Sequence, residues 1–163
     1  ITDEAPAKGI IQSKIKRTKN KMIIGLGEDL VDIDRIQKLI DNKGNAFLKK
    51  CFTPFEIEIA DKNKTGQHYI SYFAKRFAAK EACLKALGTG MREGLSWQDM
   101  SVGNDGLGRP ILDICGGVKE RLKTLTPAEH KPVLHITLSD EANLAKATVI
   151  LEAIPLDKSK LTL

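Results

Sequence analysis

The residues best suited to chemistry lie in the stretch 76–90, RFAAKEACLKALGTG. Lys80, Glu81 and Lys85 stand in an otherwise apolar, alanine-rich segment, and Glu81 and Lys85, four residues apart, share one face of a helix. Buried charge without a partner is costly, so packing alone does not explain these side chains. A carboxylate, an ammonium group and a glycine-rich turn close together suit a metal ion and a phosphate group.

A second acidic position follows the apolar run at residues 22–24. Gly25 and Gly27 precede Asp29, and alternation from residue 26 onward places Asp29 on the side of Gly27 and Val31, among apolar neighbours. A carboxylate in that place needs a cation or a hydrogen-bond donor. The alternative is a helix N-cap or a turn aspartate that is satisfied by nearby backbone.

The elements that must position these residues are both helices and strands. The pattern predicts a strand at 22–25, a helix near 32–42, a short element at 46–51, another helix after the capping-box pattern at Thr53, and a long helix at 68–87. The rest predicts strands at 100–104, 111–114, 133–138 and 145–153, with a hairpin turn at 105–110 and a helix at 118–124. This order indicates an α+β domain with an antiparallel sheet packed by the long helix.

The length and charge of the chain limit the classes of function. The 163 residues, 42% of them hydrophobic, suffice for one domain with its own core. Residues 1–21 carry six basic and two acidic side chains, so the remaining chain is near neutral despite a net charge of +5. We expect a flexible leader at 1–21, either a tag remnant or a natural extension, a domain at 22–156 and a tail at 157–163. We expect no nucleic-acid partner, because the net charge outside residues 1–21 is near zero. We expect no membrane partner, because no apolar run reaches transmembrane length.

The three cysteines are widely spaced and form no CxxC pair; they are Cys51, Cys83 and Cys115. Their spacing supports neither a zinc site nor a disulfide framework. A reducing, cytoplasmic location fits this pattern best.

Several segments in order resemble the holo-[acyl-carrier-protein] synthases, the short type of 4′-phosphopantetheinyl transferase. They are GLGEDLVDIDRI (25–36), FAKRFAAKEACLKALGTG (73–90), GLSWQDMSV (94–102), DGLGRP (105–110), and LHITLSDE (134–141) followed by AKATVILE (145–152). The resemblance implies transfer of the 4′-phosphopantetheine arm of coenzyme A to a serine of apo-acyl carrier protein, for fatty acid biosynthesis. The other product is adenosine 3′,5′-bisphosphate. It also implies a Mg²⁺ cofactor and a homotrimer whose coenzyme A sites are shared between neighbouring subunits.

The same resemblance implies roles for individual residues. Asp29 and Glu81 match the two metal ligands of the family, and Lys85 matches the lysine that reaches the pyrophosphate. The alternative for Lys85 is a structural ion pair with Glu81 on the same helix face. Glu28, beside Asp29, adds a carboxylate that could disturb or supplement the metal site. The coenzyme A contacts implied by the motifs are Arg76, Lys80, Lys85, Gly88, Thr89, Gly90, Arg109, Pro110 and His135. Lys80 is the less certain companion of Arg76, because a solvated lysine explains it equally well.

The base that removes the proton from the acceptor serine has two candidates. They are Glu81, acting through a water on the metal, and His135. We favour the water route, because such a water needs no dedicated side chain with a tuned pKa.

The segment after Asp29 is basic and suits an acidic acyl carrier protein. We expect Arg35, Lys38 and Leu39 to contact the carrier, while the alternative is a solvated helix face. A non-catalytic binding module is a second function class, but it predicts loss of Asp29 or Glu81, and both are present. A different nucleotide enzyme would need a P-loop or a GxGxxG motif, and GLGEDL lacks the third glycine.

Overall fold

The computed structural model describes residues 20–62, 66–92 and 94–157. The predicted leader at 1–21 and tail at 157–163 therefore fall almost wholly outside the described residues. The described elements, in chain order, are β1 (Met22–Asp32), α1 (Ile33–Lys43), α2 (Asn45–Cys51), α3 (Pro54–Lys62), α4 (Gly66–Ala86), the short 3₁₀ helix η1 (Trp97–Asp99), β2 (Met100–Asn104), β3 (Pro110–Ile114), α5 (Gly116–Leu125), β4 (His130–Glu141) and β5 (Leu144–Pro155).

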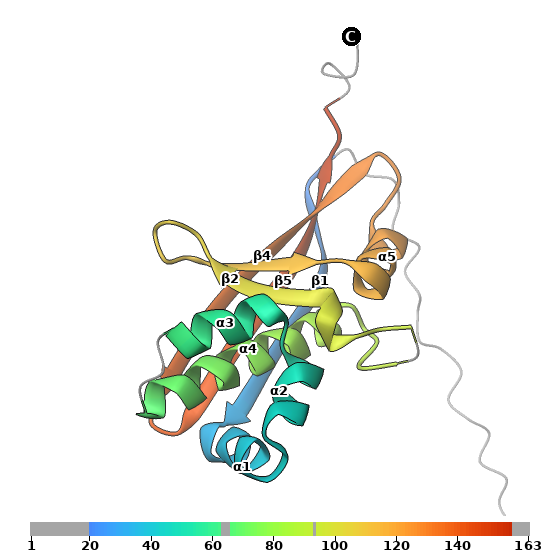
Figure 1. Cartoon of the computed structure of the whole chain (residues 1–163). Helices are drawn as coiled ribbons and strands as arrows, with labels where there is room; N and C mark the ends of the chain where they lie inside the picture. Colours follow the sequence, from blue (N-terminus) through green and yellow to red (C-terminus); the bar gives the residue numbers. More distant parts are fainter. Residues whose placement is uncertain (1–19, 63–65, 93, 158–163) are drawn as a thin grey trace, which may run out of the picture.

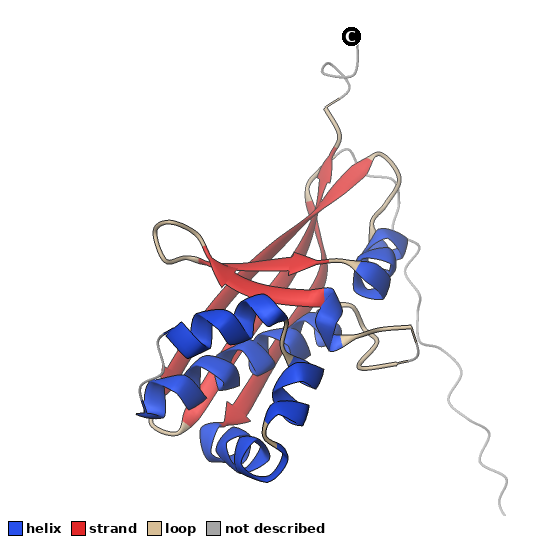
Figure 2. Ribbon diagram, viewed as in Figure 1, coloured by secondary structure: helices blue, strands red, loops and turns tan. Residues whose placement is uncertain are grey.

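The strands form two antiparallel sheets, and the predicted α+β class is confirmed. One sheet has the order β1-β5-β4, and the other is the β2–β3 hairpin. The helices α1–α4 gather on one side of the larger sheet, and the hairpin crosses above α3 and α4 and leads into α5 (Figure 1). Figure 2 shows the same two-layer arrangement of helix and strand.

The first strand is longer than the sequence pattern predicts. It does not end at Gly25 but runs to Asp32, and it pairs with β5 along its length, for example Gly27 with Val149. The glycines are needed for packing rather than for a turn. A Cβ on Gly27 would lie 2.0 Å from the Ala82 carbonyl oxygen of α4, and a Cβ on Gly25 would lie 2.3 Å from the Ala86 carbonyl oxygen. Only glycine therefore lets α4 lie this close to β1.

Small side chains bring α4 equally close to the rest of the sheet. Ala78 and Ala82 of α4 are fully buried. On β5, Ala145 is fully buried and Ala147 is 1% exposed. Aromatic rings fill the wider space on the other side of α4, where Phe52 and Phe73 have ring centroids 4.6 Å apart. The core therefore lies on both sides of α4 and holds this helix in place.

Within the described ranges, no helix is long and apolar enough to cross a membrane.

Candidate active site

Asp29 projects from β1 toward α4. Gly27 and Val31 are buried on this face of the strand, and Asp29 lies between them with a side chain that is only 15% exposed. Asp29 is not a helix cap, because Asp32 caps α1 by accepting a hydrogen bond of 2.8 Å from the Asp34 backbone N–H. The carboxylate of Asp29 thus lies beside α4 and does not cap a helix.

Glu81 and Lys85 meet Asp29 from α4. The Lys85 Nζ donates to Asp29 Oδ1 at 2.7 Å and to the Glu28 carbonyl oxygen at 3.0 Å. Burial, and then the charge of Asp29, raise the pKa of the Glu81 carboxyl, whereas the cations Lys85 and Arg35 act in the opposite direction. The lysine therefore pairs with Asp29 across two elements, and two carboxylates lie close enough to repel each other.

Glu28 does not belong to this group. Its side chain projects from the other face of β1, where its Oε2 lies 3.0 Å from Lys146 Nζ and 3.2 Å from Thr148 Oγ1. Two carboxylates, Asp29 and Glu81, are thus left at the α4–β1 contact. They suit Mg²⁺, which commonly takes one or two carboxylates together with substrate phosphates. The described residues contain no cluster of three or more His, Cys, Asp or Glu side chains that would make a full protein cage.

Lys80 is not available to coenzyme A, which corrects the sequence-based expectation. Its side chain is fully buried, and its Nζ donates to Glu56 Oε2 at 2.7 Å and to the Cys51 carbonyl oxygen at 2.8 Å. Every described partner of this ammonium lies inside the protein. A phosphate at the surface would have to displace a buried ion pair to reach it.

The glycines at the end of α4 form a helix cap. The Gly88 N–H donates to the Lys85 carbonyl at 3.0 Å, and the Thr89 N–H donates to the Leu84 carbonyl at 3.2 Å, which is the Schellman pattern. Gly88 and Gly90 have φ of 68° and 60°, which favour glycine. The N–H groups of Gly88 and Thr89 are therefore occupied, but the Thr89 hydroxyl is buried with no hydrogen-bond partner in the described part of the chain.

Arg76 lies in a cleft of about 490 Å³ between α3, α4, the β2–β3 hairpin and β4. Its guanidinium carbon lies 3.3 Å from the centre of the Tyr72 ring, and its Nη2 donates to Asn104 Oδ1 at 3.2 Å. The Arg76 Nε and the Tyr72 hydroxyl are buried, and neither has a hydrogen-bond partner among the described residues. These two groups can donate hydrogen bonds to a polar ligand in the cleft, which Pro110 also lines.

Arg109, Pro110 and His135 lie together around a second cleft, of about 310 Å³. His135 pairs with Ile150 of β5, which pairs with Leu26 of β1, so these three residues share one face of the sheet. Leu26 is 65% exposed and alternates with the glycines that face α4. His135 therefore projects from the face opposite Asp29, and its Nε2 lies 2.9 Å from Glu152 Oε2.

The residues expected to contact a carrier protein lie on α1. Arg35 and Lys38 are exposed, whereas Leu39 is half-buried and packs against the core. Because the charge of Arg35 acts on Glu81, this end of α1 borders the carboxylate pair.

Sequence reasoning gave no role to Asp140, which forms a polar cluster at the edge of the first cleft. Asp140 accepts from Ser71 Oγ at 2.5 Å and from Lys75 Nζ at 2.7 Å, and so ties β4 to α4. No short-range pattern could have indicated it, because the partners are more than sixty residues apart.

Comparison with known proteins identifies the family. Residues 25–145 match the family model described as the 4′-phosphopantetheinyl transferase superfamily. This chain is 48% identical to the protein named holo-[acyl-carrier-protein] synthase from Rhizobium leguminosarum bv. trifolii and 46% identical to the protein of that name from Chelativorans sp.. The matches cover 82% and 83% of this chain, and 98% and 100% of those two proteins. The crystal structure of a holo-(acyl-carrier-protein) synthase from Bacillus anthracis in complex with CoA (3′,5′-ADP) has 35% identity and a TM-score of 0.64, covering 80% of this chain and 97% of that one. The chain belongs to the 4′-phosphopantetheinyl transferase superfamily and, within it, to the holo-[acyl-carrier-protein] synthase family.

Proposed function

We infer that this protein transfers the 4′-phosphopantetheine group of coenzyme A to a serine of apo-acyl carrier protein, for fatty acid biosynthesis. The family and its named members support this reaction, and one member was crystallised with CoA (3′,5′-ADP). The observation within the chain that carries the inference is the meeting of Asp29, Glu81 and Lys85 at the α4–β1 contact. The serine oxygen bonds to the phosphorus that carries the pantetheine arm, the bond from that phosphorus to the bridging oxygen breaks, and adenosine 3′,5′-bisphosphate leaves.

Asp29 and Glu81 are the residues that would hold Mg²⁺. Their donor set fits the ion, because both are carboxylates and the charge of Asp29 already raises the pKa of Glu81. A shared divalent cation would remove this repulsion. When bound, Mg²⁺ supplies positive charge that stabilises the negative charge of the leaving group.

Lys85 and Arg76 are the proposed phosphate ligands of the chain. The Lys85 side chain is 53% exposed, so its ammonium can exchange Asp29 for a pyrophosphate oxygen without uncovering a buried group. Arg76 has a buried Nε with no partner among the described residues, beside a cleft wide enough for a nucleotide portion. We propose that Thr89, Gly90, Arg109 and Pro110 also contact coenzyme A.

Glu81 is the better placed of the two candidate bases. It lies near Asp29 on the helical side of the sheet, whereas His135 of the same subunit projects from the opposite face. We propose that the serine proton leaves toward Glu81 and that His135 contacts coenzyme A instead.

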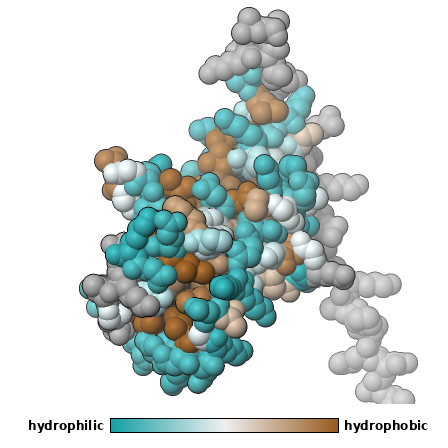
Figure 3. Space-filling model, viewed as in Figure 1, coloured by the Kyte–Doolittle hydropathy of each residue, from teal (hydrophilic) through white to brown (hydrophobic). Residues whose placement is uncertain are grey.

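We propose a homotrimer in which the uncovered face of the larger sheet is the contact. On β1 this face exposes Ile23, Leu26 and Leu30 by 68%, 65% and 59%. The helical side, which faces the viewer in Figure 3, carries hydrophilic residues with apolar patches among them. Since His135 lies on the apolar face, packing of that face against a neighbour would bring His135 to a site in another subunit. Light scattering after size-exclusion chromatography tests the mass, and Leu26→Glu is expected to give monomers.

We further propose that residues 22–156 form the whole catalytic domain and that it acts in the cytoplasm. The first and last strands of this range pair with each other. Met22, at the start of the range, lies opposite Ala153, near its end, so the pairing brings the two ends of the domain together. Cys51, Cys83 and Cys115 are all free thiols, which fits a reducing compartment.

The experiment that tests the function is direct. The protein is incubated with coenzyme A, Mg²⁺ and an apo-acyl carrier protein, and the carrier is weighed by mass spectrometry. We expect the mass of one 4′-phosphopantetheine group to appear on serine. An unchanged carrier, with protein that circular dichroism shows to be folded, would contradict the inference.

A further inference from the structure

A complete ion pair is buried beside the candidate active site and takes no part in the proposed chemistry. Lys80 of α4 and Glu56 of α3 are both fully buried, and the Lys80 Nζ lies 2.7 Å from Glu56 Oε2. Lys80 directly precedes Glu81 in the chain. The pair therefore acts on the backbone that carries a proposed metal ligand.

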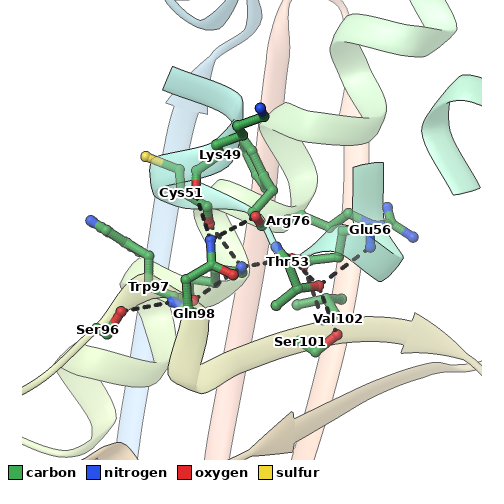
Figure 4. Close-up of polar contacts among 12 residues, drawn as sticks. Lys49, Cys51, Thr53, Glu56, Arg76, Ser96, Trp97, Gln98, Ser101 and Val102 are labelled. Atoms are coloured by element: carbon green, nitrogen blue, oxygen red, sulfur yellow. Dashed lines mark hydrogen bonds and ion pairs between the residues drawn. The ribbon is translucent and has the colours of Figure 1, made fainter. Parts of the chain in front are cut away.

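Every polar atom of this pair has a partner. The three donors of the Lys80 ammonium meet three acceptors, which are Glu56 Oε2, the Cys51 carbonyl oxygen at 2.8 Å and the Trp97 carbonyl oxygen at 3.3 Å. The Glu56 carboxylate also accepts from the Thr53 N–H at 2.7 Å and from the Val102 N–H at 3.0 Å. Figure 4 shows Glu56 beside Thr53 and Val102, with Cys51 and Trp97 from other segments of the chain nearby. One network thus joins the end of α2, the start of α3, η1 and β2 to a single side chain of α4.

Stability does not explain such a pair. Taking both charges out of water offsets most of their attraction, and apolar replacements of similar volume are often neutral or stabilising. Directed hydrogen bonds, in contrast, fix geometry better than apolar contacts do. What the network specifies is therefore the rotation of α4 about its axis at Lys80.

That rotation decides where Glu81 and Lys85 lie. The outer part of a helical side chain is about 5–6 Å from the helix axis, so a rotation of about 20° moves it by about 2 Å. Lys85 Nζ is 2.7 Å from Asp29 Oδ1, and a movement of that size would break this contact. A misplacement of about 1 Å at a reacting centre is enough to lower a rate by about 10²-fold.

We propose that Glu56 and Lys80 are positioning residues for the transfer reaction, which set the rotation of α4 so that Glu81 and Lys85 meet Asp29. This inference rests on the proposed function. It assigns Lys80 a role without substrate contact, in place of the coenzyme A contact that the motif implied.

The test separates position from stability. Lys80→Met removes the ammonium and leaves a buried carboxylate, whereas the double variant Glu56→Met with Lys80→Met removes both charges and restores an apolar interior. Leu122→Ala in the buried face of α5 is the control, because it lowers stability without touching the network. For each variant we would measure the thermal midpoint, kcat and KM for the carrier, and the affinity for Mn²⁺ in the presence of coenzyme A by electron paramagnetic resonance. Mn²⁺ takes the same oxygen ligands as Mg²⁺.

We expect the double variant to recover the thermal midpoint of the wild type but not its activity. Its kcat should stay lower by about 10²-fold and its Mn²⁺ affinity by about 10-fold or more, with KM for the carrier nearly unchanged. Leu122→Ala should lose thermal stability and keep both kcat and Mn²⁺ affinity at temperatures where it is folded. If Lys80→Met does not fold, the double variant decides alone.

Recovery of kcat and Mn²⁺ affinity together with stability in the double variant would show that the pair is only structural, and would overturn the proposal. Failure of the proposed function is recognised separately, because the wild type would then transfer nothing to the carrier. In that case the Mn²⁺ affinities of the variants still report whether Glu56 and Lys80 position Glu81.

Discussion

The Lys85 ammonium lies 2.7 Å from Asp29 Oδ1, and this contact joins α4 to β1 at the point where coenzyme A phosphates are proposed to bind. The two partners differ in exposure, since the Lys85 side chain is 53% exposed and that of Asp29 is 15% exposed. The hydrogen bond to Asp29 raises the pKa of the Lys85 amine, so the amine stays charged at neutral pH. A fixed carboxylate and a movable cation suit a site in which an anionic substrate must enter.

Lys85→Met should therefore separate function from stability. An ion pair with one exposed partner contributes no more than about 1 kcal/mol, so the free energy of unfolding in urea should change by that amount or less. The transfer rate should fall by about 10²-fold, because a charged donor to the pyrophosphate is lost. Lys62→Met is the matched control, since Lys62 forms an exposed pair of 2.6 Å with Glu58 on α3. Equal loss of activity in both variants would contradict a phosphate role for Lys85.

Glu81→Gln should abolish transfer and yet stabilise the protein. Burial and the charge of Asp29 raise the pKa of Glu81, so the folded state disfavours its ionised form relative to the unfolded chain. The penalty applies above the raised pKa and disappears as the pH falls below the ordinary value of 4.5, where the group is protonated in both states. We expect the variant to be more stable than the wild type at pH 7, by at most about 1 kcal/mol for a half-buried group, and equal to it at pH 3–4.

Denaturant unfolding of Glu81→Gln and wild type across this pH range is the measurement. A variant that is less stable at pH 7 would mean that Glu81 has a structural partner. A variant that keeps most of its turnover with metal binding intact would remove Glu81 from the proton transfer.

Much of this site could be predicted from local pattern. The four-residue spacing of Glu81 and Lys85 and the two-residue alternation through Asp29 are short-range properties, and the structure places all three residues together. The predicted helices and strands are present, with β1, β4 and β5 longer than expected. These strands extend beyond the predicted bounds because pairing with a neighbouring strand keeps glycine and polar residues in extended backbone, and tertiary pairing overrides local propensity.

The remainder depends on contacts that spacing does not encode. Glu56 fits a capping box with Thr53, and that pattern gives no sign of Lys80, which lies 24 residues further on. The alternation in β4 shows that His135 has a preferred face. Which face this is depends on the strand order β1-β5-β4, and the sequence alone does not determine that order.

Gly27→Ala should move α4 away from β1. The added Cβ would lie 2.0 Å from the Ala82 carbonyl oxygen and 2.5 Å from the Ala86 backbone nitrogen, and neither backbone atom can turn aside. We expect a loss of about 1–3 kcal/mol in stability. The transfer activity of the folded variant should also fall, by more than the loss of folded protein explains, because Asp29 lies on β1 and Lys85 on α4, the two elements that separate. Gly106→Ala in the hairpin turn is the control, since its Cβ would meet nothing within 4 Å. Similar stability of both variants would contradict the close approach of α4.

Arg35→Glu should weaken recognition of the carrier and leave coenzyme A binding nearly unchanged. Arg35 is exposed on α1, and reversal of a rim charge mainly slows association with an acidic partner. We expect KM for the carrier to rise by about 10-fold at low salt and the difference to shrink as salt is added. Lys119→Glu on α5 makes the same change of charge at an exposed position outside α1. Steady-state kinetics at several salt concentrations, with calorimetry for coenzyme A, is the measurement; equal loss of both affinities would indicate misfolding instead.

Asp140→Asn should lower stability at neutral pH but not in acid. Hydrogen bonds from Lys75 and then Ser71 lower the pKa of Asp140 below its ordinary value of 3.8. The folded state therefore favours the carboxylate, and its contribution is present above 3.8 and lost as the pH falls through the lowered folded value. For a pair whose side chains are 27% and 36% exposed we expect a loss of about 0.5–1 kcal/mol at pH 7. Urea unfolding between pH 2 and pH 7 should show the wild-type advantage shrink toward the acid end, and Asp113→Asn, at an exposed position of β3, is the control. A difference that stays the same across this pH range would mean that Asp140 acts through shape or packing rather than through its charge.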